Sequence, residues 1–129
     1  MEHWSVPMTY RPKADAVFAG TCRQTIRRGN KYQPGDTLTI FEWSGKPRRS
    51  KWGRRCRARV TESWLWQFDD WGVSNPMMTY GWGSSYLSEL AAKDGIVPPT
   101  GEALRDTLRA LNGGEGWEGW YQVVRWEVI

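Results

Sequence analysis

Two neighbouring segments decide the fold: AGTCRQTIRR (residues 19–28) and KYQPGDTLTI (residues 31–40). They predict a binding loop, a short strand over Thr25–Arg28, a tight turn and a better strand over Thr37–Trp43. The turn falls at Pro34-Gly35-Asp36, because proline restricts one φ, glycine permits a positive φ and aspartate accepts hydrogen bonds from nearby N–H groups. Basic side chains and the Thr25 hydroxyl therefore gather at one edge of a small sheet, a set of groups that suits phosphate or the polar edge of a base.

The remaining elements follow from apolar periodicity. Helical spacing predicts helices between Pro12 and Gly20, between Ser84 and Gly95, and between Thr100 and Gly113. Alternation predicts a long strand over Cys56–Phe68 and a terminal strand over Tyr121–Ile129 that pairs with it. We expect a loop over residues 69–85. The sequence thus predicts an α+β fold, a small mixed sheet curled into a barrel with an early helix and two helices inserted before the last strand.

The length and charge distribution constrain the class of protein. A chain of 129 residues can bury one core, so we expect a single domain over 1–129. Residues 1–59 hold 14 Lys/Arg against 4 Asp/Glu, and residues 60–129 hold 4 against 10, so the net charge is +10 in the first part and −6 in the second. A basic face of this kind attracts polyanions such as RNA or DNA, although a solvated basic loop would look the same.

Much of the basic charge lies in residues 44–55, which we expect to form a long flexible hairpin loop. Its basic side chains surround one aromatic ring, a composition typical of a finger that holds the phosphate backbone and stacks on a base; an exposed loop with a single anchoring Trp is the alternative. Together with the first segment, the predicted nucleic-acid-binding residues are Arg23, Arg27, Arg28, Arg48, Arg49, Lys51, Trp52, Arg54 and Arg55.

Cysteine and histidine usage argues against metal chemistry. Cys22 and Cys56 lack the paired spacing of a zinc site, and His3 lies near a terminus that we expect to be mobile. We therefore expect no metal and no cofactor. The first twenty residues contain no apolar run and no segment is long enough to cross a membrane, so we expect a cytoplasmic protein with reduced thiols and no membrane partner.

From about Thr9 to the C-terminus, the order of elements resembles the ASCH domain, a branch of the PUA-like superfamily of compact β-barrels. Three motifs carry the resemblance: Gly20-Thr21-Cys22-Arg23-Gln24-Thr25-Ile26-Arg27, Pro34-Gly35-Asp36 and Ala91-Ala92-Lys93-Asp94-Gly95. In family members these places hold a Gly-Lys-Lys-Thr-x-Thr-Ile-Arg-type segment, a Gly-Asp turn and a late helix that ends in an acidic residue and glycine.

The resemblance extends to small bacterial members that hydrolyse N4-acetylcytidine, and it implies a catalytic Lys, Thr and carboxylate. Lined up by the Thr-Ile-Arg triplet, the catalytic residues are Thr25 and Asp94, one methylene shorter than the usual Glu. Cys22 stands at the Lys place, and the neighbouring Arg23 cannot act as a base because a guanidinium stays protonated. Cys22 is either a nucleophile or a structural thiol, and Asp94 either acts in catalysis or forms a structural ion pair with one of the clustered arginines.

Three hypotheses follow. The leading one is an RNA- or nucleotide-binding ASCH module, favoured by the absent Lys. The second is an enzyme, either an amidohydrolase on an acylated nucleoside or an RNA-cleaving ASCH protein. The third, from the Trp-rich composition alone, is a protein-interaction module of phage origin. Oligomeric state is left open.

Overall fold

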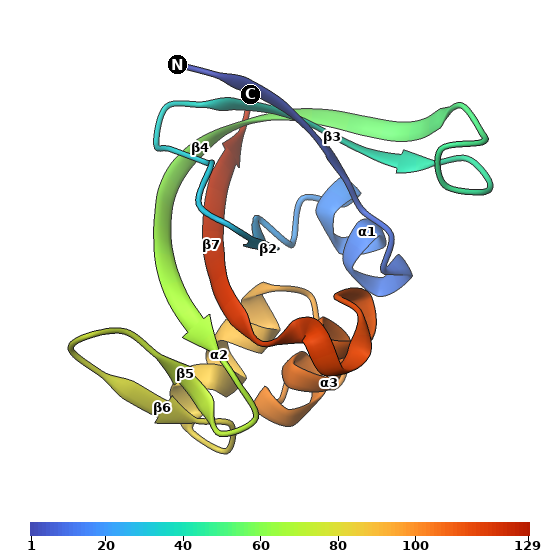
Figure 1. The fold of residues 1–129 in the computed structure, drawn as a ribbon. Helices are drawn as coiled ribbons and strands as arrows, with labels where there is room; N and C mark the ends of the chain where they lie inside the picture. The colour runs from blue at the N-terminus through green and yellow to red at the C-terminus, as the bar shows by residue number, and fades with distance from the viewer.

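The computed structural model describes residues 1–129 and contains one seven-stranded mixed sheet (Figure 1). Its elements in chain order are β1 (His3–Pro7), α1 (Arg11–Phe18), β2 (Gln24–Arg28), β3 (Thr37–Trp43), β4 (Trp52–Phe68), β5 (Gly72–Ser74), β6 (Thr79–Gly81), α2 (Ser85–Lys93), α3 (Gly101–Leu111), a 3₁₀ helix η1 (Gly114–Trp117) and β7 (Gly119–Val128). The predicted α+β class is confirmed, with the two late helices inserted before β7 as expected.

The sheet curls around a long central strand but does not close. β4 pairs with β3, β5 and β7, all antiparallel, and β7 also pairs with β2. A register shift between Val60 and Glu62 interrupts the β4–β7 ladder, and irregularities of this kind bend a strand. β1, β2 and β6 each have one unpaired side. One side-chain bond, from Arg27 to the Pro7 carbonyl, joins the β2 edge to the β1 edge across the opening.

Two hydrophobic cores lie on opposite faces of this sheet. One, which includes Ile26 and Val123, packs against α2 and α3. The other, which includes Val124 and Val60, packs against α1. Because side chains alternate along a strand, neighbouring residues of β2 and β7 reach different cores. Consecutive side chains of β2 consequently face two different environments.

The N-terminus corrects one expectation. His3 belongs to β1, which runs parallel to β3 with His3 opposite Thr37. Its ring nitrogens bond the hydroxyls of Thr37 at 2.7 Å and Thr39 at 2.9 Å, so the expected mobile terminus is wrong. Trp4 and Val6 face the core and alternate with His3 and Ser5, so the segment carries a short period-two signal for a strand.

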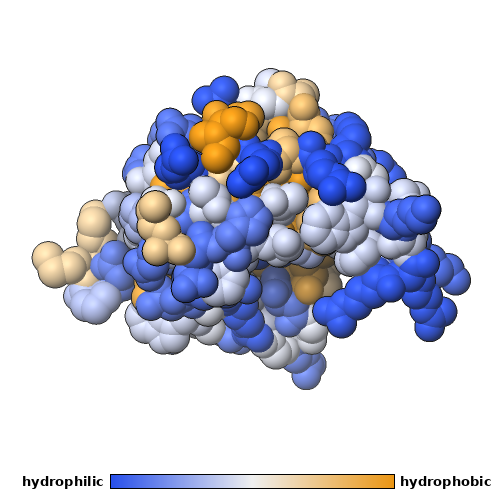
Figure 2. All heavy atoms as spheres, turned by 90° about the horizontal axis from the view of Figure 1, so that it is seen from above, coloured by the Kyte–Doolittle hydropathy of each residue, from blue (hydrophilic) through white to orange (hydrophobic).

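Two predicted loops are shorter than expected. The hairpin loop spans residues 44–51, because Trp52 continues the β4 ladder opposite Trp43 and stacks on Phe41 with ring centroids 3.8 Å apart. Within residues 69–85, β5 and β6 form a small hairpin, since Asp69 and Asn75 accept backbone N–H bonds that close the turns on either side of β5. Figure 2 shows hydrophilic side chains projecting on the side where the β3–β4 hairpin lies.

No helix of the protein combines the length and the apolar character needed to cross a lipid bilayer.

The carboxylate of Asp36 ties β1 to the turn before β3. It accepts hydrogen bonds from the backbone N–H groups of Glu2 and Gln33, both at 3.0 Å, and from the Trp4 indole at 3.1 Å. Burial alone would raise the pKa of Asp36, but these donors outweigh it and hold the pKa below its ordinary value of 3.8.

We predict that Asp36→Ala lowers the free energy of unfolding by about 2–4 kcal/mol at neutral pH, because buried N–H donors lose a charged acceptor. A carboxyl whose pKa is lowered by folding stabilises the protein above its ordinary pKa and loses that contribution as the pH falls through the lowered pKa. Urea denaturation at several pH values should show the difference between the two proteins shrinking in acid. Asp106→Ala, at an exposed site on α3, is the control and should change stability by about 0.5 kcal/mol or less. An equal effect of the two variants would contradict this account.

Candidate functional site

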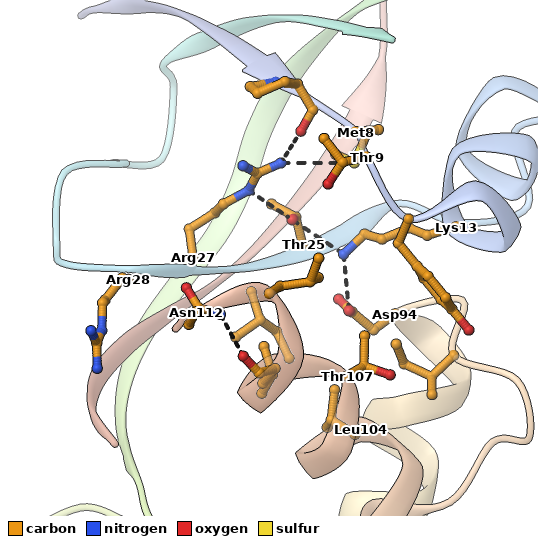
Figure 3. Close-up of a pocket in the computed structure, with 16 residues that line it drawn as sticks. Met8, Thr9, Lys13, Thr25, Arg27, Arg28, Asp94, Leu104, Thr107 and Asn112 are labelled. Atoms are coloured by element: carbon orange, nitrogen blue, oxygen red, sulfur yellow. Dashed lines mark hydrogen bonds and ion pairs between the residues drawn. The ribbon is translucent and has the colours of Figure 1, made fainter. Parts of the chain in front are cut away.

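Lys13 is the centre of the site, and it projects from α1 into the molecule. The helix buries Lys13, Ala14 and Val17, so the lysine lies on the same face as the apolar residues that pack on the sheet. Its Nζ donates to Asp94 Oδ2 at 2.9 Å and to Thr25 Oγ1 at 3.2 Å. Lys13 therefore joins α1, β2 and the end of α2 at one point (Figure 3).

Thr25 receives a second cationic donor from its own strand. Arg27 Nε donates to Thr25 Oγ1 at 3.2 Å, while an Arg27 terminal nitrogen donates to the Pro7 carbonyl. Arg27 is thus held in place by β1. Two cationic donors on one hydroxyl oxygen stabilise negative charge that develops there.

Asp94 closes the cluster from the C-terminal end of α2. A carboxylate at this end is opposed by the helix dipole, and Asp94 is only 3% exposed. Burial raises the pKa of Asp94 above its ordinary value of 3.8, and the Lys13 ammonium opposes that shift. Gln24 Nε2 donates to the other carboxylate oxygen at 3.2 Å, so both oxygens have partners.

These groups form the polar end of a pocket with a volume of about 160 Å³. One water needs roughly 10–15 Å³ in such a cavity, so a ligand of several heavy atoms can enter. The opposite wall is apolar and comes from Ile96 and the α3 residues Leu104 and Leu108. The pocket therefore combines hydrogen-bonding groups at one end with a flat apolar side, as small-molecule sites commonly do.

The predicted residues Thr25, Arg27, Arg28 and Asp94 all line this pocket. The direct ion-pair partner of Asp94 is Lys13, however, and not one of the arginines of residues 23–28. Arg28 donates to the carbonyls of Gly116 at 2.7 Å and Glu118 at 2.6 Å, which ties it to η1. Arg23 lies apart, in a different hollow with Thr21, Gln24, Lys93 and Arg125.

Some basic residues of the β3–β4 hairpin form ion pairs and others do not. Arg54 forms ion pairs with Glu42 at 2.5 Å and with Asp15 at 2.7 Å. The Trp52 ring stacks on Phe41, and the Arg55 guanidinium lies 5.4 Å from the centre of the Trp52 ring. Exposed basic side chains without a carboxylate partner are Lys46, Arg48, Arg49, Lys51 and Arg55.

A second hollow, of about 180 Å³, connects this hairpin to the pocket. Gly45 and Pro47 of the loop line it, and it shares Met8 and Thr9 with the Thr25 pocket. The hairpin loop therefore lies next to the Thr25 pocket, with Met8 and Thr9 between the two hollows.

Cys22 is a buried thiol. Its Sγ lies 3.3 Å from the Lys93 carbonyl and 3.5 Å from the Gln24 carbonyl, either of which can accept its single hydrogen, and burial raises its pKa above the ordinary value of 9.0. A thiol that is kept protonated is a poor nucleophile. An amine does contact Thr25, but it belongs to Lys13 of the preceding helix.

Sequence reasoning missed Lys13, although a signal for it exists. Lys13 precedes Val17 by four residues, so the two lie on one helical face. A lysine within the apolar face of a short helix is unusual unless it is paired. The partner, 81 residues away, could not be identified from that spacing.

The structure combines a curled mixed sheet with helices at its open side. A solved structure similar to this chain is the ASCH domain from Lactobacillus crispatus JV V101, with a TM-score of 0.59 and 14% identity over 98% of this chain and 79% of that one. No family model matches the sequence, and no curated protein matches it. The chain thus has the ASCH fold, as its motifs indicated.

We predict that Lys13→Met lowers the free energy of unfolding by about 3–5 kcal/mol at neutral pH, because it leaves a buried carboxylate without its cation. Since burial raises the pKa of Asp94, the neutral form favours the folded state, and stability is lost as the pH rises through that raised pKa. The defect of Lys13→Met should therefore shrink as the pH falls.

Urea denaturation followed by Trp fluorescence measures this dependence. The control is Lys93→Met, whose exposed pair with Glu89 should contribute about 0.5 kcal/mol or less. A defect of Lys13→Met that is the same at all pH values would show that lost packing, and not the unpaired carboxylate, is its cause.

Proposed function

We propose that the protein binds RNA or a nucleotide, with a nucleobase in the Thr25 pocket. The observation that carries this proposal is the division of the pocket into a polar end, at Thr25 and Arg27, and an apolar wall, at Leu104 and Leu108. A base has flat faces that pack on apolar side chains and an edge that forms hydrogen bonds. The Thr25 hydroxyl can donate and accept, so it suits the edge of a base.

The basic hairpin supports the same proposal for the phosphates. Lys46, Arg48, Arg49 and Lys51 are available for backbone contacts, and the adjoining hollow leads from the loop to the pocket. Contacts of this kind supply affinity and position, whereas contacts to the base supply selectivity.

A second candidate function, hydrolysis of an acylated nucleoside, is favoured by the contact between Lys13 and Thr25. The Lys13 ammonium lies 2.9 Å from Asp94 and 3.2 Å from Thr25 Oγ1, so it can pass a proton from the hydroxyl to the carboxylate. As Thr25 Oγ1 attacks the acyl carbonyl, its proton moves through Lys13 to Asp94 and returns by the same route to the leaving amino group. Water then hydrolyses the acyl-threonine.

For binding, we predict that log K for a single-stranded RNA falls linearly with log salt, and that the Arg48→Ala, Arg49→Ala double variant makes the slope shallower by about 1.4. The reason is the loss of two phosphate contacts, each releasing a counterion. Fluorescence anisotropy at several salt concentrations measures the slope.

The matched control is Arg105→Ala with Arg109→Ala, which removes the same charge from α3, where both side chains pair with aspartates. It should leave the slope nearly unchanged. Absence of binding to any RNA or DNA oligomer at low salt would reject this proposal and favour the interaction-module hypothesis.

For hydrolysis, we predict release of acetate from N4-acetylcytidine, with Thr25→Val lowering kcat/KM at least ~100-fold and Thr25→Ser retaining part of the activity. Thr25→Val keeps the side-chain shape and removes the hydroxyl, together with the hydrogen bonds that it accepts from Lys13 and Arg27. Chromatography of the nucleoside product provides the readout, and the same incubations with RNA test the cleavage alternative. If the native protein releases no cytidine, Lys13 and Asp94 serve to position Thr25 for binding alone.

A further inference from the structure

A second cationic hollow lies against β2, separate from the Thr25 pocket and outside the function proposed for it. It has a volume of about 220 Å³ and is lined by Thr21, Arg23, Gln24, Lys93 and Arg125, with no apolar residue. Gln24 and Thr25 are consecutive in β2, so their side chains point to opposite faces of the strand. The two sites are therefore back to back.

Both guanidinium groups in this hollow are oriented by their Nε atoms. Arg125 Nε donates to Gln24 Oε1 at 3.0 Å, and Arg23 Nε donates to the Gly20 carbonyl at 3.4 Å. Neither arginine has a carboxylate within ion-pair distance, and their terminal nitrogens have no acceptor in the protein. Two guanidinium groups held in this way present free N–H donors, which match the oxygens of a phosphate.

The side chains that hold Arg125 in place are Trp64 and Gln24. Its guanidinium lies over the Trp64 ring, 4.9 Å from the ring centre. Gln24 is 1% exposed, and its Nε2 donates to the Leu90 carbonyl and to Asp94. Because both donors are used, the Gln24 oxygen must face Arg125. Because these side chains are already held in place, they lose less conformational entropy when a ligand binds.

Lys93 completes the set from the last turn of α2. The negative end of that helix would disfavour an anion, and the Lys93 charge offsets it. Lys93 has only an exposed pair with Glu89 at 3.4 Å, so it can turn toward a ligand at little cost.

We propose that this hollow is a phosphate-binding site in which Arg23 and Arg125 bind the phosphate oxygens and Lys93 adds charge. The ligand is a phosphate group, which can belong to a terminal phosphomonoester or to the phosphodiester backbone of RNA. Titration with inorganic phosphate at constant ionic strength, followed by NMR of the arginine Nε–H groups, tests the proposal. We expect saturable shifts at Arg23 and Arg125.

Arg125→Gln and Arg23→Gln should each weaken phosphate binding about 10-fold or more, because each removes a charged hydrogen bond. Arg57→Gln, which removes an exposed arginine of β4, should leave it unchanged. Shifts reproduced by chloride at equal ionic strength, or an equal loss in Arg57→Gln, would overturn the proposal. So would native protein that gives no saturable shift.

RNA oligomers then distinguish the two sources of phosphate. If a 5′-phosphorylated oligomer shifts the Arg23 and Arg125 signals and its 5′-hydroxyl counterpart does not, the site takes the terminal group. If both shift them, it takes the backbone. Both results support a phosphate site, and neither depends on occupancy of the Thr25 pocket.

Discussion

The structure depends most on the ion pair between Lys13 and Asp94, because it closes the open side of the sheet. β2 is an edge strand, and β1, another edge strand, does not pair with it. The ends of α1 and α2 meet at this gap, and each would bury an uncompensated charge without the other. Removal of two charges from water is favourable only when their geometry and remaining hydrogen bonds are good. Thr25 and Gln24 supply those bonds, so the pair also orients both faces of β2.

One consequence is that binding groups on the two sides of β2 share a carboxylate. Lys13 holds one oxygen of Asp94 on the side of the Thr25 pocket, and Gln24 holds the other on the side of Arg125. The same buried groups thus stabilise the fold and position the candidate ligand contacts.

The ten tryptophans show how little composition says about role. Trp66, Trp82, Trp117 and Trp126 are buried in the two cores, whereas Trp71 is 88% exposed beside the β5–β6 hairpin. Trp71 and Trp82 both lie in residues 69–85, the segment expected to form a loop, and that pattern does not separate a buried ring from an exposed one. Trp82 is buried because its indole N–H bonds the Asp69 carbonyl and its ring packs near Phe68. Only the approach of distant segments distinguishes the two rings.

The sequence by itself determined the local elements: α1, β3, α2 and α3, their caps at Ser84 and Thr100, and the order that resembles ASCH domains. These follow from periodicity and from side-chain to backbone bonds within a few residues. The tertiary structure decided the parallel pairing of β1, the contact of Lys13 with Asp94 and that of Gln24 with Arg125, which is 101 residues distant. Such contacts depend on strand register and on how helices pack over a sheet edge. Local sequence patterns contain no information on strand register or on helix packing. Lys13 would occupy the same helix face, but in contact with water, if α2 ended at a different place.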